Sequence, residues 1–100
     1  MAAQDRLRSE IETFESMLTV LDDYGLHARP AASLARTAQN FKSEIRLSAG
    51  TCSADAKSIL DILSLAAGRN TELKLFCRGE DALAAGAALS ELFKNKFAQE

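Results

Sequence analysis

The one histidine of the sequence, His27, lies where a helix is expected to begin. A turn at Gly25 precedes it, and small and apolar residues repeat with helical spacing over residues 28–40. Pro30 falls in the first turn of this predicted helix, where its missing N–H costs nothing. The N–H groups of a first turn have no partners inside the helix, and the helix dipole places partial positive charge there. An anion is therefore expected to bind beside the ring of His27.

Arg29 adds a full positive charge two residues after His27, with donors that suit phosphate oxygens. Residues 24–43 contain three basic side chains and no acidic one, although the formal net charge of the chain is −2. A neutral imidazole nitrogen is a nucleophile, and its attack on a phosphorylated donor gives phosphohistidine. We therefore predict His27 as the reacting residue and Arg29 as the side chain that stabilises the phosphate.

The sequence pattern argues against several other kinds of site. Residues 25–32 contain no Ser, Cys, Asp or Glu, so a carboxylate that orients the ring must come from elsewhere in space. No nucleotide-binding loop of the type G-x-x-x-x-G-K-[ST] occurs. Cys52 and Cys77 have neither C-x-x-C spacing nor a histidine at ligand spacing. We expect no cofactor, no metal site and two buried free thiols.

Composition narrows the class of protein further. With 12 basic and 14 acidic residues, the 100-residue chain lacks the positive charge typical of nucleic-acid-binding domains. No stretch reaches the roughly 20 apolar residues of a membrane span, and the N-terminus lacks the apolar run of a secretory signal. We expect a cytoplasmic protein with no nucleic-acid partner and no membrane span.

Periodicity predicts an α+β fold, an open-faced β-sandwich. In this fold a four-stranded antiparallel sheet carries three helices on one face, in the order β-α-β-β-α-β-α, and a short N-terminal helix precedes it. Residues 1–15 are expected to form a helical extension, and residues 16–100 the domain. The expected elements are a helix over 5–15, a strand over 17–21, a helix over 28–40, strands over 43–48 and 51–54, a helix over 55–67 with Asp55 as its cap, a strand over 72–77 and a helix over 81–97.

The segment Tyr24-Gly25-Leu26-His27-Ala28-Arg29-Pro30-Ala31-Ala32 resembles the active-site segment of the HPr family. These proteins are the histidine-containing phosphocarriers of the bacterial phosphoenolpyruvate-dependent phosphotransferase system. Lys57-Ser58-Ile59-Leu60 resembles the regulatory-serine segment of the family, and Ser64-Leu65 the end of its short helix. The expected order of elements fits the family over residues 17–97.

The resemblance implies a phosphocarrier rather than an enzyme. His27 would accept phosphate from enzyme I, which phosphoenolpyruvate charges, and would pass it to enzyme IIA-type acceptors in sugar uptake or its regulation. Arg29 would balance the phosphate. An HPr kinase would phosphorylate Ser58. Docking of the partners would use an apolar patch formed by Leu26, Leu60 and Leu63.

Several residues depart from the family pattern and leave alternatives open. Tyr24 replaces the usual Asn or Ser, Asp61 places an acid in the expected docking surface, and Ala66 replaces a glycine. Ser58 could be a plain helix cap, and Leu60 and Leu63 could belong to the core. The alternative function is a regulatory interaction module switched by phosphorylation of Ser58. A small hydrolase that uses His27 as a base is a weaker alternative.

Overall fold

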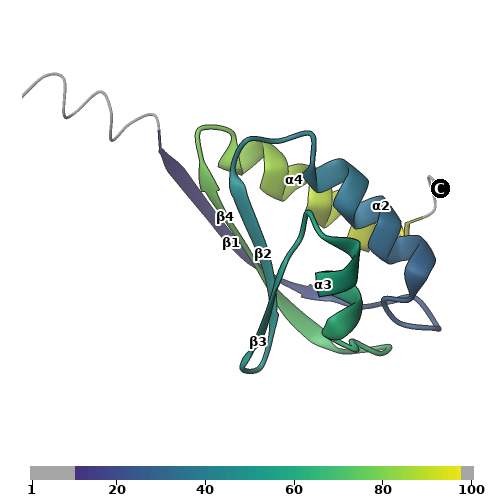
Figure 1. Cartoon of the computed structure of the whole chain (residues 1–100). Helices are drawn as coiled ribbons and strands as arrows, with labels where there is room; N and C mark the ends of the chain where they lie inside the picture. Colours follow the sequence, from purple (N-terminus) through teal and green to yellow (C-terminus); the bar gives the residue numbers. More distant parts are fainter. Residues whose placement is uncertain (1–10, 98–100) are drawn as a thin grey trace, which may run out of the picture.

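The computed structural model describes residues 11–97. Its sheet has four antiparallel strands in the order β1-β4-β2-β3, and the three helices of the described residues lie on one face of the sheet (Figure 1). The predicted open-faced sandwich and its order of elements are confirmed. Along the chain the elements are β1 (Glu12–Thr19), α2 (Ala28–Ala38), β2 (Glu44–Ala49), β3 (Cys52–Asp55), α3 (Ile59–Ser64), β4 (Glu72–Gly79) and α4 (Ala82–Lys94).

The central strands form because their side chains alternate between a buried and a solvent-facing side. In β4, Leu73, Leu75 and Cys77 are buried, and the residues between them are not. In β2, Ile45 and Leu47 are buried in the same way. The sheet thus presents one apolar face to the helices and one largely polar face to solvent.

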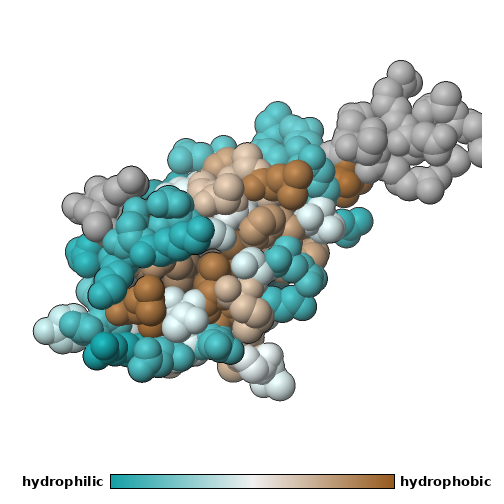
Figure 2. Space-filling view, turned by 180° about the vertical axis from the view of Figure 1, so that it is seen from behind, coloured by the Kyte–Doolittle hydropathy of each residue, from teal (hydrophilic) through white to brown (hydrophobic). Residues whose placement is uncertain are grey.

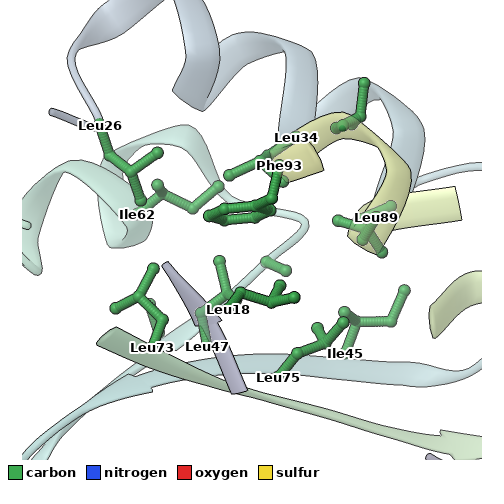
Figure 3. Close-up of a cluster of buried hydrophobic side chains, with 14 of the residues drawn as sticks. Leu18, Leu26, Leu34, Ile45, Leu47, Ile62, Leu73, Leu75, Leu89 and Phe93 are labelled. Carbon is green, nitrogen blue, oxygen red and sulfur yellow. The ribbon is translucent and has the colours of Figure 1, made fainter. Parts of the chain in front are cut away.

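The helices close the core over this apolar face. Leu34 of α2, Ile62 of α3 and Leu89 of α4 are fully buried and belong to one hydrophobic cluster with Leu47 and Leu75 of the sheet (Figure 3). Burying a leucine or isoleucine side chain contributes roughly 1.5–3 kcal/mol. The core therefore holds each helix against the sheet.

The edge strand β1 is held by its pairing with β4 and by a close contact with α4. Pairing runs from Glu12 opposite Gly79 to Thr19 opposite Glu72. The ring of Phe14 lies against Gly86 of α4, where an added Cβ would come within 2.3 Å of the ring. Glycine inside a helix lowers helix stability by about 1 kcal/mol relative to alanine. The close approach of Phe14 explains why a glycine stands at position 86.

A second contact ties the start of α4 to the start of β2. The carboxylate of Asp81 accepts hydrogen bonds from the backbone N–H groups of Lys42 and Ser43, each at 2.9 Å, and from the Ser43 hydroxyl. These hydrogen bonds, that of the Ser43 hydroxyl above all, hold the pKa of Asp81 below its usual value. The charged form of Asp81 thus stabilises this corner of the fold.

The N-terminal region differs from the prediction. A helix was expected over residues 5–15 and a strand from Met17, but Glu12–Thr19 is one continuous strand. Phe14 fits the helical spacing of its neighbours, yet it pairs with Cys77 of β4. Long-range pairing overrides so short a local pattern. The strand begins inside the predicted extension of residues 1–15, and residues 5–10 of the predicted helix lie outside the described residues.

Three further expectations differ from the structure. Asp55 does not cap the third helix, because it ends β3 and Ser58 is the N-cap of α3. Cys52 is exposed in the short strand β3, whereas Cys77 is buried as expected. Burial, with a smaller contribution from the charge of Asp81, raises the pKa of Cys77 to about 11. The last helix ends at Lys94, three residues earlier than predicted.

None of the helices within residues 11–97 is long and apolar enough to cross a membrane.

We predict that Gly86→Ala lowers the midpoint of thermal unfolding by about 5 °C or more, because the new methyl group overlaps the ring of Phe14. Differential scanning calorimetry measures the effect. In a Phe14→Ala background the same substitution should be neutral or stabilising, since alanine is the better helix former. Equal destabilisation in both backgrounds would contradict the contact.

Candidate functional site

The turn between β1 and α2 is shaped by Asp22 and Gly25. The carbonyl of Asp22 accepts a hydrogen bond from the N–H of Gly25 at 3.0 Å, and its carboxylate accepts one from the N–H of Tyr24 at 2.9 Å. Gly25 has φ +73°, and a Cβ here would come 2.5 Å from the carbonyl oxygen of Ala67. Only glycine tolerates both the positive φ and this close approach.

Leu26 anchors the end of the turn in the core. Its N–H donates to the carbonyl of Ala67 at 2.9 Å, and 5% of the residue is exposed. Its side chain lies beside Ile62 of α3 (Figure 3). Because Leu26 is directed inward, the next residue, His27, comes to the surface at the start of α2.

His27 is the N-cap residue of α2, with extended backbone angles of φ −80° and ψ −170°. Its carbonyl accepts the hydrogen bond from Ala31 at 3.0 Å, but its ring makes no capping bond. The first turn of α2 carries no acidic residue. The positive end of the helix dipole is therefore not neutralised by that turn, and it lies beside an imidazole whose side chain is 37% exposed.

Asp22 lies between the two predicted site residues. Its Oδ1 is 3.5 Å from Nε2 of His27, and its Oδ2 is 3.6 Å from a terminal nitrogen of Arg29. The Asp22 side chain is 10% exposed, much less than those of His27 and Arg29. The Tyr24 ring meets the His27 ring edge to face, with centroids 5.9 Å apart. An acid, an imidazole and a guanidinium thus form one cluster.

The cluster lies in a surface depression that also receives a lysine from the far end of the chain. Its lining is Leu21, Asp22, Asp23, Tyr24, His27, Arg29 and Lys96. Lys96 reaches this place because the chain after α4 turns sharply, with positive φ at Lys96 and Phe97 and with Phe97 buried. Two basic and two acidic side chains therefore surround the ring.

The two nitrogens of the ring are not equivalent. Nε2 is enclosed and has no hydrogen-bond partner within ordinary distance, with the Asp22 carboxylate as its charged neighbour. With Nε2 on the inner side of a half-exposed ring, Nδ1 is the nitrogen left to react. The start of α2 and the Arg29 guanidinium supply positive charge for an incoming anion. The arrangement suits a nucleophile that takes up a phosphoryl group.

Within residues 11–97, no group of three or more His, Cys, Asp or Glu side chains could hold a metal ion.

The other predicted site residues lie on or near α3, which packs beside α2 (Figure 1). Leu60 is 78% exposed and Leu63 is half-buried, while Leu26 lies in the core and offers little surface to a partner. The Ser58 hydroxyl accepts a hydrogen bond from the N–H of Asp61 at 3.2 Å. Ser58 thus serves as a helix cap here.

Sequence reasoning missed Asp22 and Lys96 as members of the site. Asp22 had a usable signal, since an Asp two residues before Tyr24-Gly25 is typical of a turn in which the carboxylate bonds the backbone. Lys96 had no local signal. Its position depends on how the end of α4 packs, 69 residues from His27 along the chain.

A second depression lies between β1 and α4 and has a mainly apolar lining that includes Phe14, Met17, Leu21 and Phe93. Seen from behind, hydrophobic residues gather near the middle of the molecular surface, between hydrophilic margins (Figure 2). No imidazole lines this depression. His27 and its charged neighbours thus belong to the depression at the start of α2.

Comparison with known proteins identifies relatives over most of the chain. A family described as "PTS HPr component phosphorylation site" matches residues 14–95. The chain is 44% identical over 81 residues to the phosphocarrier protein HPr of Treponema pallidum (strain Nichols), an alignment that covers 81% of this chain and 92% of the relative. It is 42% identical over 86 residues to that of Xylella fastidiosa (strain Temecula1), covering 86% and 97%.

Solved structures of HPr proteins are also similar to this chain. A crystal structure of "HPr-C-His" from Thermoanaerobacter tengcongensis has a TM-score of 0.83 and 37% identity, and the match covers 87% of this chain and 98% of that one. A phosphocarrier protein HPr from Bacillus anthracis has a TM-score of 0.77 and 32% identity, covering 81% and 96%.

Proposed function

The chain belongs to the HPr family of phosphocarriers of the phosphotransferase system, and we propose that His27 is its phosphoryl-accepting residue. In this proposal enzyme I, charged by phosphoenolpyruvate, donates the phosphoryl group, and enzyme IIA-type proteins accept it. The single observation that carries the proposal is the position of His27 at the start of α2, with its ring half exposed and Nε2 enclosed.

The proposed step needs positioning more than acid–base chemistry. The lone pair of Nδ1 attacks phosphorus as the bond from phosphorus to the donor breaks and its electron pair returns to the donor. The phosphoryl oxygens then lie near the first N–H groups of α2 and the Arg29 guanidinium, which offset their charge. Transfer to the acceptor runs the same step in reverse and regenerates the ring.

A carrier of this kind ends each cycle as it began, with a free imidazole. The protein is therefore proposed to be a shared substrate of two larger enzymes rather than an enzyme itself. A small open depression is consistent with that role, because both partners must reach the same nitrogen.

For docking, we propose the exposed apolar side chains of α3. Leu60 and Ile59 are exposed, and Leu63 is half-buried beside them. Leu26, also expected in this patch, contributes to it from below as part of the core. Burial of an exposed leucine by a partner is worth roughly 1.5–3 kcal/mol.

We predict that incubation with enzyme I and phosphoenolpyruvate adds one phosphate that is labile in acid and stable in base. The adduct should be absent from His27→Ala, because the nucleophile is gone. Intact-protein mass spectrometry before and after acid treatment measures it. No adduct on the wild-type chain, with an enzyme I that phosphorylates a second carrier in the same assay, would overturn the proposal.

Intact-protein mass spectrometry also distinguishes the phosphocarrier from the regulatory alternative. If the protein is instead a module switched at Ser58, ATP and an HPr kinase should add an acid-stable phosphate that Ser58→Ala loses. His27→Ala should then leave that labelling unchanged.

Arg29→Gln is predicted to slow phosphoryl transfer from enzyme I about tenfold or more, because a hydrogen bond between charged groups contributes about 1.5–3 kcal/mol. Its unfolding midpoint should stay within about 3 °C of wild type, since the side chain is exposed. Rapid-quench kinetics give the rate. Arg36→Gln, at the other end of α2, is the matched control and should transfer at the wild-type rate. A large loss of stability in Arg29→Gln would show a structural role instead.

Leu60→Glu is predicted to raise the KM for phosphorylation by enzyme I about tenfold, with little change in kcat, because a charge replaces buried apolar surface at the interface. Leu83→Glu is the matched control. Leu83 is also an exposed leucine, but it lies at the start of α4, whereas Lys96 beside His27 follows the end of that helix. Equal effects of both substitutions on KM would argue against docking through α3.

A further inference from the structure

We propose that Asp22 is a positioning residue that keeps a proton on Nε2 of His27 and thereby leaves the lone pair of Nδ1 free to attack phosphorus. This inference rests on the proposed function of His27 and deepens it. It assigns to a residue in the turn before α2 the orienting role that no residue of the segment 25–32 can supply.

The geometry shows which group faces the inner side of the ring. Nε2 is enclosed, and the charged atom near it is Oδ1 of Asp22 at 3.5 Å. An enclosed ring nitrogen beside a carboxylate is most stable when it carries a hydrogen, because the N–H dipole points at the negative charge. The carboxylate therefore selects the tautomer with hydrogen on Nε2.

Asp22 is itself held in place. Its Oδ1 accepts the hydrogen bond of the Tyr24 N–H at 2.9 Å, and a carboxylate oxygen has a second lone pair for the ring. Its Oδ2 is 3.6 Å from the Arg29 guanidinium. With 10% of the side chain exposed, the carboxylate has little freedom to turn away. The turn and Arg29 thus hold the Asp22 carboxylate beside the imidazole.

The neighbouring charges do not duplicate this role. Asp23, the adjacent acid, is directed to Arg69, with Oδ1 3.6 Å from a guanidinium nitrogen. Arg29 and Lys96 are positive and would not favour a proton on the ring. Tyr24 contacts the ring edge to face through its own aromatic ring and is not a carboxylate. Among the residues that line the depression, Asp22 is the negative group that contacts Nε2.

The charge balance of the reaction explains why a hydrogen on Nε2 favours the transfer. When Nδ1 bonds to phosphorus, the ring keeps its hydrogen on Nε2 and becomes positively charged, which the Asp22 carboxylate offsets. When the acceptor takes the phosphoryl group, the N–P bond breaks and its electron pair returns to Nδ1. The ring then leaves as neutral imidazole, because the hydrogen is still on Nε2. Asp22 thus favours both transfers with no net movement of a proton.

The test separates the charge of Asp22 from its part in the turn. Asp22→Asn removes the charge, while the amide oxygen can still accept the hydrogen bond from Tyr24. Asp22→Glu restores the charge on a longer side chain, and Asp23→Asn removes the adjacent charge. Asp23→Asn, at an exposed side chain, should unfold within about 3 °C of wild type. Because the Asp22 side chain is largely covered, the unfolding midpoints of Asp22→Asn and Asp22→Glu are measured as well, and all rates are compared at a temperature where each variant is folded.

Phosphoramidate is the donor used, so that no partner protein is needed; its P–N bond breaks and ammonia leaves. We expect Asp22→Asn to be phosphorylated on His27 about tenfold more slowly than wild type, the lower end of the loss seen when a metal-bound histidine loses its carboxylate partner. Asp22→Glu should recover part of the rate, and Asp23→Asn should match wild type. The ¹⁵N signals of the ring should show less hydrogen on Nε2 in Asp22→Asn.

If Asp22→Asn matches wild type in both rate and ring ¹⁵N signals, Asp22 only shapes the turn and the inference fails. If wild type itself does not react with phosphoramidate, the inference fails as well, because the lone pair of Nδ1 is then not available to attack phosphorus. Failure of the proposed function looks different. In that case enzyme I does not phosphorylate the wild-type chain, yet the phosphoramidate rate still depends on Asp22. If enzyme I phosphorylates wild type and Asp22→Asn equally fast, the function stands and the positioning role fails.

Discussion

The site depends on the contact between the turn before α2 and the segment after α3. Gly25 lies against the backbone of Ala67, and Leu26 both donates a hydrogen bond to that carbonyl and enters the core. These contacts fix the chain on the inner side of the turn. The next residue, His27, therefore lies at the surface, where α2 begins. Its exposed position, on which the proposed role depends, thus follows from packing of the turn.

Charge is distributed in the site so that an acid and a phosphoryl group can both lie near one imidazole. The Asp22 carboxylate is covered and lies on the Nε2 side of the ring, close to Arg29. Arg29 and Lys96 line the same depression as the ring, and the first turn of α2 carries no acidic residue. In the proposed function, Asp22 would offset the charge of the ring, while Arg29 and the start of α2 would offset the charge of the phosphoryl group. The formal net charge of −2 therefore does not describe the charge beside His27.

Prediction from sequence succeeded where the local pattern was strong and failed where distant pairing decided. In β2 and β4 the sequence alternates clearly between apolar and polar residues. Both strands lie in the middle of the sheet, where the alternation matches the buried and exposed sides. At the N-terminus a few apolar residues fitted a helix, but pairing with β4 along eight residues made Glu12–Thr19 a strand. Both Asp55 and Ser58 are residue types that suit a helix N-cap, and the sequence alone led to Asp55. In the structure β3 continues to Asp55, so the helix can start only later and Ser58 caps it.

The sequence by itself determined that the chain has one imidazole, that the imidazole precedes a helix and that a cation follows two residues later, because these are properties of neighbouring residues. It also indicated the family through the segment around His27. The tertiary structure decided which side of the ring is open and which groups surround it. Asp22 faces Nε2 only because the turn folds back, and Lys96 comes near only because Phe97 packs into the core. The turn around Asp22 has a local signal, but which atom of the ring it faces depends on how the turn packs, and the position of Lys96 depends on the folding of the whole chain.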